Sequence, residues 1–167
     1  MTESWNGTAW AVQPVPPLGE PATSTLTSVS CVSATSCTAV GSAVASELQS
    51  GPPFEIMAVT WNGMAWSLMP APSPTNIPLE PSAISCVTAS LCMITGQQQP
   101  NGNYQQPLGE LWDGTNWTEQ TVPPLGDTGE LNSVSCTTAT SCTAVGQYTD
   151  FSSTGSAAEV ARWNGST

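Results

Sequence analysis

The chain is poor in cationic and metal-ligating side chains. Its 167 residues include no His, no Lys and a single cation, Arg162, against 12 acidic residues, for a formal net charge of −11. Because one cation cannot neutralise several phosphates, we expect no nucleic-acid partner and no attraction to anionic membranes. Without His or Lys, the common nucleophile pairs and the usual catalytic zinc ligand sets cannot be built. The sequence therefore predicts no catalytic residue, no metal site and no cofactor.

Long apolar runs and helical periods are also lacking. No run approaches the 18 or so apolar residues of a membrane span, so we expect no membrane insertion. The segment 1–5 lacks the basic and apolar regions of a signal peptide. With 15 Pro and 14 Gly, the chain is interrupted too often for helices. The lack of helical periods and the frequent Pro and Gly predict an all-β protein.

Three landmarks recur along the chain in a fixed order. The first is Trp-Asn/Asp-Gly, at intervals of 56, 51 and 51 residues, and in three copies a second tryptophan follows five residues after the first. The next two are a cysteine pair with five residues between and a short apolar segment that ends in Gly. Self-similarity at this period indicates a repeat architecture. The first tryptophans are Trp5, Trp61, Trp112 and Trp163, and the second ones are Trp10, Trp66 and Trp117.

Each repeat is expected to form four short strands. In the first complete copy these are Leu26–Cys31, Cys37–Val40, Phe54–Trp61 and Trp66–Met69. Asn-Gly or Asp-Gly between apolar runs predicts a hairpin between the last two. Four strands in a repeat of about fifty residues fit a propeller blade. A β-trefoil, which also has three four-stranded repeats, is the alternative.

The repeats imply one domain over residues 1–167. Blades are predicted at 24–70, 79–120 and 129–167, the last without its fourth strand, and residues 1–14 supply a strand around Ala9–Gln13 that completes it. Propellers have four to eight blades, so three leave an open arc. If the N-terminal strand completes the last blade of another copy, head-to-tail contacts produce a ring or a filament.

The cysteines favour three local disulfides. Connectivity is formally one of fifteen, and zinc is the alternative, although the spacing is long and no His completes a site. Disulfides indicate an oxidising compartment, so we expect an extracellular or cell-surface location. The pairs are Cys31 and Cys37, Cys86 and Cys92, and Cys136 and Cys142.

The tryptophans allow two interpretations. The two rings of each hairpin lie on the same face and stabilise it, which favours packing between blades. Exposed rings would instead form weak, multivalent sugar platforms, with Trp5, Trp61, Trp112 and Trp163 as the candidate ligand-binding residues. Three glycosylation sequons fall on the hairpin turns, where turn geometry also explains the asparagine. They begin at Asn6, Asn116 and Asn164.

The repeat resembles those of tandem-repeat β-propeller proteins of actinobacteria. The segments that carry the resemblance are Trp5–Trp10 and Ser135–Gly146. It implies a secreted propeller and no particular reaction. The hairpin also looks like the Asp-box of sialidase-type propellers, with 113–117 the nearest copy and Asn in place of Asp in the others. Sialidase activity is not implied, because that family uses an arginine cluster.

We therefore expect a non-enzymatic, extracellular binding or adhesion module. Its partners would be glycans or a cell-surface molecule. The alternative is a structural protein that assembles head to tail with further copies of itself by strand exchange. A glycoside-acting enzyme would need two paired acids, and no acid pair here is marked by its context.

Overall fold

The computed structural model describes residues 2–17, 22–45, 55–70, 77–100, 102–152 and 155–166, and every regular element in these ranges is a β-strand. The all-β prediction is therefore confirmed for the described part of the chain. The strands are β1 (Thr2–Trp5), β2 (Trp10–Gln13), β3 (Ala22–Ser33), β4 (Ser36–Ala45), β5 (Glu55–Trp61), β6 (Trp66–Leu68), β7 (Leu79–Thr88), β8 (Leu91–Gln98), β9 (Gln106–Trp112), β10 (Trp117–Glu119), β11 (Thr128–Thr138), β12 (Ser141–Thr149) and β13 (Ser156–Trp163).

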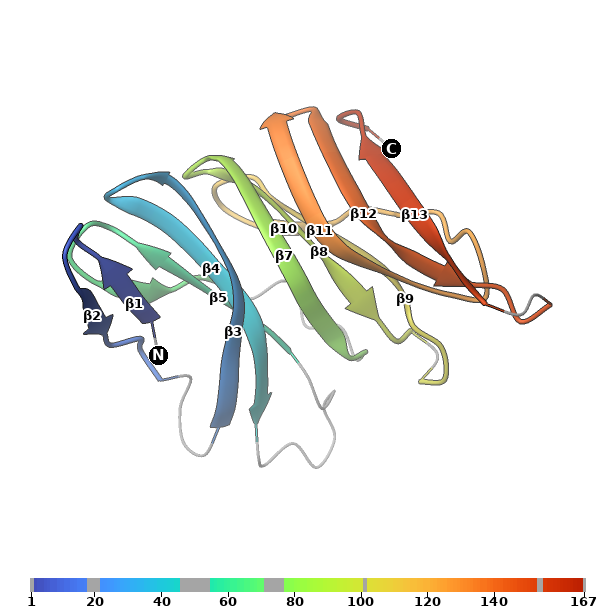
Figure 1. Cartoon of the computed structure of the whole chain (residues 1–167), viewed down its shortest axis with the longest axis horizontal. Helices are drawn as coiled ribbons and strands as arrows, with labels where there is room; N and C mark the ends of the chain where they lie inside the picture. Colours follow the sequence, from blue (N-terminus) through green and yellow to red (C-terminus); the bar gives the residue numbers. More distant parts are fainter. Residues whose placement is uncertain are drawn as a thin grey trace.

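These strands form four separate antiparallel sheets. β1 and β2 make an N-terminal hairpin, β3 to β6 the first sheet, β7 to β10 the second sheet, and β11 to β13 the third sheet. Strands within each sheet follow one another in chain order. Figure 1 shows the sheets side by side in an open row, with the N-terminal hairpin at one end and the third sheet at the other.

The predicted four strands per repeat are confirmed in the first and second sheets. Each predicted strand of the first copy lies within β3, β4 or β5 or overlaps β6, apart from Phe54, which lies outside the described residues. None of the described sheets closes into a barrel of the kind that a trefoil requires. The coarse prediction of repeated four-stranded sheets holds, and the arrangement in space is an open row.

The N-terminal strand differs from the prediction. A single strand was expected around Ala9–Gln13, but β2 pairs with β1 in a hairpin in which Trp5 lies opposite Trp10. The turn motif explains the difference, because it closes the same hairpin in every copy and so recruits the residues before it as a strand. Within this chain β2 therefore does not complete the third sheet, and β13 pairs only with β12 among the described strands.

Successive sheets pack face to face around an apolar core. In the cluster between the first and second sheets, Val40 and Ala58 meet Ile94, Leu108 and other residues of the second sheet. Because side chains alternate along a strand, each sheet sends one set of residues toward the sheet before it and the other toward the sheet after it. A sheet of this repeat therefore buries both of its faces only when another sheet packs on each side of it.

A glycine after each cysteine pair allows the first two strands of each sheet to approach closely. A Cβ added at Gly41 would overlap the carbonyl oxygen of Thr25, and Gly96 and Gly146 show the same relation to Glu80 and Glu130. A β-bulge lies beside each contact in the register of the paired strand. The recurring glycine is thus a requirement of the bulge, where no side chain fits.

Hydrogen bonds link the first strands of neighbouring sheets one repeat apart. The backbone N–H of Cys86 donates to Ser30 Oγ at 2.9 Å, and that of Cys136 donates to Ser85 Oγ, also at 2.9 Å. The third serine of this series, Ser135, is exposed on the third sheet. The series shows that each sheet offers its neighbour the same hydroxyl acceptor.

The three local disulfides are confirmed. They join Cys31 to Cys37, Cys86 to Cys92 and Cys136 to Cys142, and leave no free cysteine among the described residues. Each pair is opposite in register near the turn that connects the first two strands of its sheet. Three disulfides fit an oxidising environment.

Candidate functional site

The Trp-Asn/Asp-Gly motif builds the same turn in each hairpin. Asn6 Oδ1 accepts hydrogen bonds from the backbone N–H groups of Thr8 and Ala9, both at 2.9 Å. The glycine of each copy has a φ near +95°, which other residues rarely adopt. At Asp113 the same backbone hydrogen bonds hold the pKa of the carboxyl below its usual value. The Asn or Asp is therefore explained by the turn.

The turn sets two tryptophan rings against each other in every complete hairpin. The ring centroids of Trp5 and Trp10 lie 5.7 Å apart, and those of Trp112 and Trp117 lie 5.2 Å apart. The pair of Trp61 and Trp66 has the same tilted geometry. Such tilted contacts stabilise a hairpin beyond the area they bury.

The second tryptophan of the motif differs greatly in exposure along the chain. Trp66 and Trp117 are 8% and 5% exposed, whereas Trp10 is 66% exposed. The indole Nε1 of Trp117 donates to the carbonyl oxygen of Pro70 at 3.0 Å, and that of Trp66 donates to Gln13 Oε1 at 3.1 Å. Trp66 and Trp117 are thus buried, and each donates to a residue at or just after the last strand of the hairpin or sheet before it, whereas the ring of Trp10 is exposed.

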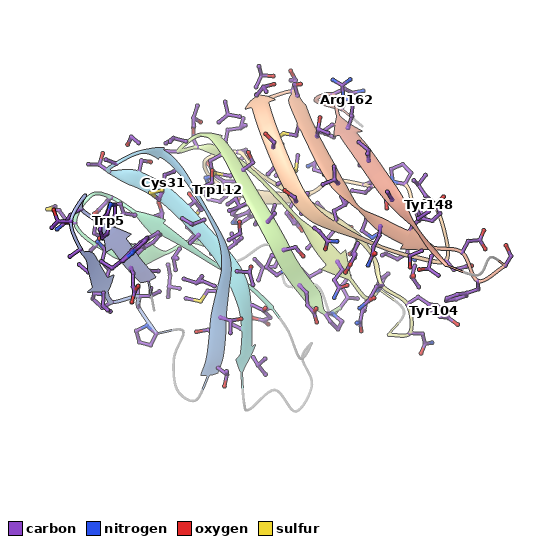
Figure 2. All side chains as sticks on the ribbon, in the orientation of Figure 1. Trp5, Cys31, Tyr104, Trp112, Tyr148 and Arg162 are labelled. Carbon is purple, nitrogen blue, oxygen red and sulfur yellow. A yellow bond between two sulfur atoms is a disulfide. The ribbon has the colours of Figure 1, made fainter. Side chains whose placement is uncertain are left out.

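The predicted sugar-binding tryptophans are not equivalent in the structure. Trp112 lies in the core between the first and second sheets, and Trp61 and Trp163 are half-buried. Only Trp5 is largely exposed, beside Trp10 on the N-terminal hairpin. Figure 2 shows Trp5 at one end of the row, Trp112 within it and Arg162 on β13 at the other end. The exposed aromatic surface of the motif is therefore confined to one hairpin.

A groove of about 210 Å³ lies between the second and third sheets. The residues that line it come from β8 and β9, from the segment after β10, and from β11, β12 and β13. This volume is below the roughly 300–1,000 Å³ typical of sites for drug-sized ligands, so it suits a single side chain or a small ring. Its lining includes Thr95, Gly109, Thr121, Ala144, Glu159 and Trp163.

Three buried polar atoms that line this groove have no hydrogen-bond partner. They are Thr95 Oγ1, Glu159 Oε2 and Trp163 Nε1. Glu159 is 2% exposed, and its burial raises the pKa of its carboxyl above the usual value. A buried polar atom without a partner is costly, so these groups mark the groove as a place where a further donor or acceptor is favoured.

A second buried carboxyl lies away from the groove. Glu110 on β9 is opposite Glu119 on β10, and burial together with the charge of Glu119 raises the pKa of Glu110 from 4.5 to about 7. A carboxyl with a pKa near neutrality can act as a general acid. Glu110 does not line the groove, however, and Val59 and Ala161 hold its place in the neighbouring repeats.

Sequence reasoning did not identify the groove or Glu159. A comparison of the repeats could have identified Glu159. The residue four positions before the first motif tryptophan is apolar in two repeats, as Met57 and Leu108, and acidic in the third, as Glu159. An acid at a core position of one repeat indicates a local difference in packing. The groove itself depends on how two sheets meet, which the sequence of one repeat does not reveal.

No protein-family model matches the chain, and no curated protein matches it closely enough to indicate a relationship. Among the described residues, no helix is long and apolar enough to cross a membrane, and no group of three or more His, Cys, Asp or Glu is placed to hold a metal ion.

Proposed function

We propose that the chain is a non-enzymatic structural module of an extracellular, oxidising setting, in which copies associate head to tail. Each four-stranded sheet acts as a propeller blade, and the third sheet of one copy docks on the N-terminal end of the next. The proposal rests on a difference in exposure: residues that are buried between the first and second sheets have equivalents in the third sheet that are exposed.

The outward face of the third sheet is apolar at the positions that are buried between sheets in the other repeats. Val145 and Val160 are 45% and 64% exposed, whereas their counterparts in the first sheet, Val40 and Ala58, are 0% and 2% exposed. Ser135, whose counterparts each accept a backbone N–H from the next sheet, is exposed on the same sheet. This face therefore has the chemistry of an interface between sheets and no described sheet against it.

The N-terminal end has the complementary character. It presents the exposed Trp10 and Val12 on β2, in a hairpin that pairs with no other described strand. β1 corresponds in the repeat to the end of β13, since Trp5 and Trp163 are the same motif residue. β13 of a second copy can therefore take the place of β1 beside β2, which would complete the third sheet and remove two open strand edges.

This exchange is head-to-tail, because the two surfaces that meet are different. Such an interface leaves one surface of each kind free after every step, so it forms rings where the rotation closes and filaments where it does not. The arrangement of the described sheets in an open row supports this, since neither end of the row has another described sheet against it. The repeat can then bury both faces of every sheet.

The proposal is tested by the mass of the chain in solution as its concentration is raised. Val160→Asp places a charge on the outward face of the third sheet and should weaken association by at least about 10-fold, as is usual for a charge at a packed interface. Met64→Asp, which adds the same charge on an exposed turn, is the matched control. A Val160→Asp variant that associates as well as the control would contradict the proposal.

Glycan binding is a second candidate, and one observation favours it. Trp5 and Trp10 form an exposed, tilted pair of rings at a single end of the chain. Exposed aromatic rings present apolar surface that can stack on sugar rings. Quenching or shifting of tryptophan fluorescence by a panel of sugars tests it, with Trp5→Ala as the discriminating variant, because β13 of a second copy replaces β1 and the loss of Trp5 should not weaken head-to-tail association.

A further inference from the structure

The groove between the second and third sheets corresponds, position by position, to the seat of Trp117 one repeat earlier. Trp117 packs in a cluster with Val40 and Ala58 of the first sheet and with Ile94, Leu108 and Trp112 of the second. The residues at the same repeat positions around the groove are Thr95, Gly109, Ala144, Glu159 and Trp163. The residues that line the groove therefore occupy the repeat positions that surround the indole ring of Trp117 in the second sheet.

The sequence position of the acceptor that Trp117 uses has a counterpart beside the groove, although Trp66 donates instead to the side chain of Gln13. Trp117 Nε1 donates to the carbonyl oxygen of Pro70, the fourth residue after Trp66. The fourth residue after Trp117 is Thr121, which lines the groove. A ring in the groove would therefore meet a backbone carbonyl at the place where the ring of Trp117 meets one.

The groove differs from the seat of Trp117 in size and polarity. Ala144 stands where the second sheet has Ile94, and Glu159 where it has Leu108. The smaller and more polar lining leaves the open volume and brings the unpartnered Glu159 Oε2 and Thr95 Oγ1 to it. An indole has one N–H, which can donate either to the Thr121 carbonyl oxygen or to one of these two side-chain oxygens, whereas a purely apolar ring donates to none of them.

We infer that this groove is the binding site for the indole of Trp10 from a second copy of the chain, an inference that rests on the head-to-tail function proposed above. Trp10 is the only fourth-strand tryptophan whose ring is exposed, and it holds the same motif position as Trp117. When β2 pairs with β13 in the register of the other hairpins, Trp10 lies opposite Trp163, as Trp117 lies opposite Trp112. That register delivers the ring to the groove.

The first test uses the full chain with Trp10 replaced. Trp10→Ala should weaken association roughly 30-fold or more, as expected when a buried interface anchor is lost. Trp10→Phe keeps a ring and removes the N–H, so it should have an intermediate effect. Trp5→Ala is the matched control, because Trp5 is an exposed tryptophan of the same hairpin that does not enter the groove. It lies on β1, which β13 of the second copy replaces, so its loss should not weaken association.

The second test addresses the groove directly. Ala144→Trp fills it from within and should weaken association as much as Trp10→Ala. A peptide with the sequence of residues 8–13 should compete with association and shift the amide resonances of Thr95, Ala144 and Ala161 in the unchanged chain, whereas the same peptide with alanine for tryptophan should not. The peptide arm does not depend on whether the Ala144→Trp variant folds.

The outcomes separate this inference from the proposed function. If the chain associates but Trp10→Ala and the peptide have no effect, the indole site is wrong and head-to-tail association stands. If the chain stays monomeric at every concentration, the proposed function is wrong, and so is the assignment of the groove to a second copy. Peptide binding by such a monomer would reassign the groove to a tryptophan-bearing strand of another protein, and no peptide binding would remove the indole site altogether.

Discussion

Trp117 donates its indole N–H to the carbonyl oxygen of Pro70, 47 residues earlier in the chain, at 3.0 Å. This bond joins the last strand of the second sheet to the segment that leaves the first sheet. The ring of Trp117 packs in the core between the first and second sheets. Residues at the same repeat positions as this tryptophan and its acceptor are found at both ends of the row, as Trp10 in the N-terminal hairpin and Thr121 beside the groove.

Replacement of Trp117 should be far more destabilising than replacement of Trp10. Trp117→Ala removes a buried ring and its hydrogen bond, so we expect a loss of about 3–5 kcal/mol in the free energy of unfolding. Trp10→Ala, measured at a concentration where the chain is monomeric, should cost under about 1 kcal/mol, because the ring is exposed. Urea unfolding measures both. Equal losses would mean that the two rings have similar surroundings.

Gly96→Ala should destabilise the second sheet strongly. The added Cβ would overlap the carbonyl oxygen of Glu80 across the bulge, and backbone atoms on paired strands have little room to move. We expect a loss of roughly 3 kcal/mol or more, at the upper end of point substitutions. Gly155→Ala is the control, because no atom lies within 4 Å of its added Cβ. A small effect at position 96 would show that the bulge can relax.

Stability should fall as pH rises because of Glu110. Its pKa is raised in the native chain from 4.5 to about 7, so between these values the native state binds more protons than the unfolded state. This contribution is present below about pH 4.5 and is lost as the pH rises through about 7. Glu110→Gln should therefore stabilise the chain at about pH 8, by roughly 1–2 kcal/mol after allowance for solvent screening, with little change at about pH 4.

Thermal unfolding of both proteins at the two pH values measures this effect. Glu130→Gln provides a control on a half-buried acid, which accepts hydrogen bonds from the side chains of Gln147 and Asn132. If the stability advantage of Glu110→Gln were independent of pH, the carboxyl would not be titrating in this range.

Association should strengthen as salt is added. Every copy carries a formal charge of −11 with one cation, so approaching copies repel each other. Raising the ionic strength from about 0.01 to 0.15 M shortens the screening length from about 30 to 8 Å and weakens that repulsion. Sedimentation at both ionic strengths measures the change. Weaker association at high salt would mean that charge attraction, and not apolar packing, holds the copies together.

Much of the fold follows from the repeat. Because Trp-Asn/Asp-Gly, the cysteine pair and the following glycine each have one local structural solution, their order predicts the strands, the hairpins and the disulfides of each sheet. The extra strand β1 was not predicted, although the hairpin motif at Trp5 implies a strand before it. Local patterns thus identify the strands and hairpins, but not how the strands at the ends of the row pair.

The candidate site was harder to predict. Trp61 and Trp112 carry the same motif as Trp5, so their sequences alone do not distinguish a core ring from an exposed one. Burial depends on which sheet lies next to each ring, and that is a property of the whole row. The groove beside Glu159 has the same origin, since it lies between two sheets whose contact no single repeat encodes.

A mixing experiment tests whether unlike ends of two copies meet. One variant, Trp10→Asp with Val12→Asp, blocks the N-terminal end, and another, Val145→Asp with Val160→Asp, blocks the outward face of the third sheet. Each should remain a monomer of about 17.2 kDa alone, and the mixture should form a dimer of twice that mass and nothing larger. If the mixture stays monomeric, or if either variant pairs with itself as well as the unchanged chain does, head-to-tail association is wrong.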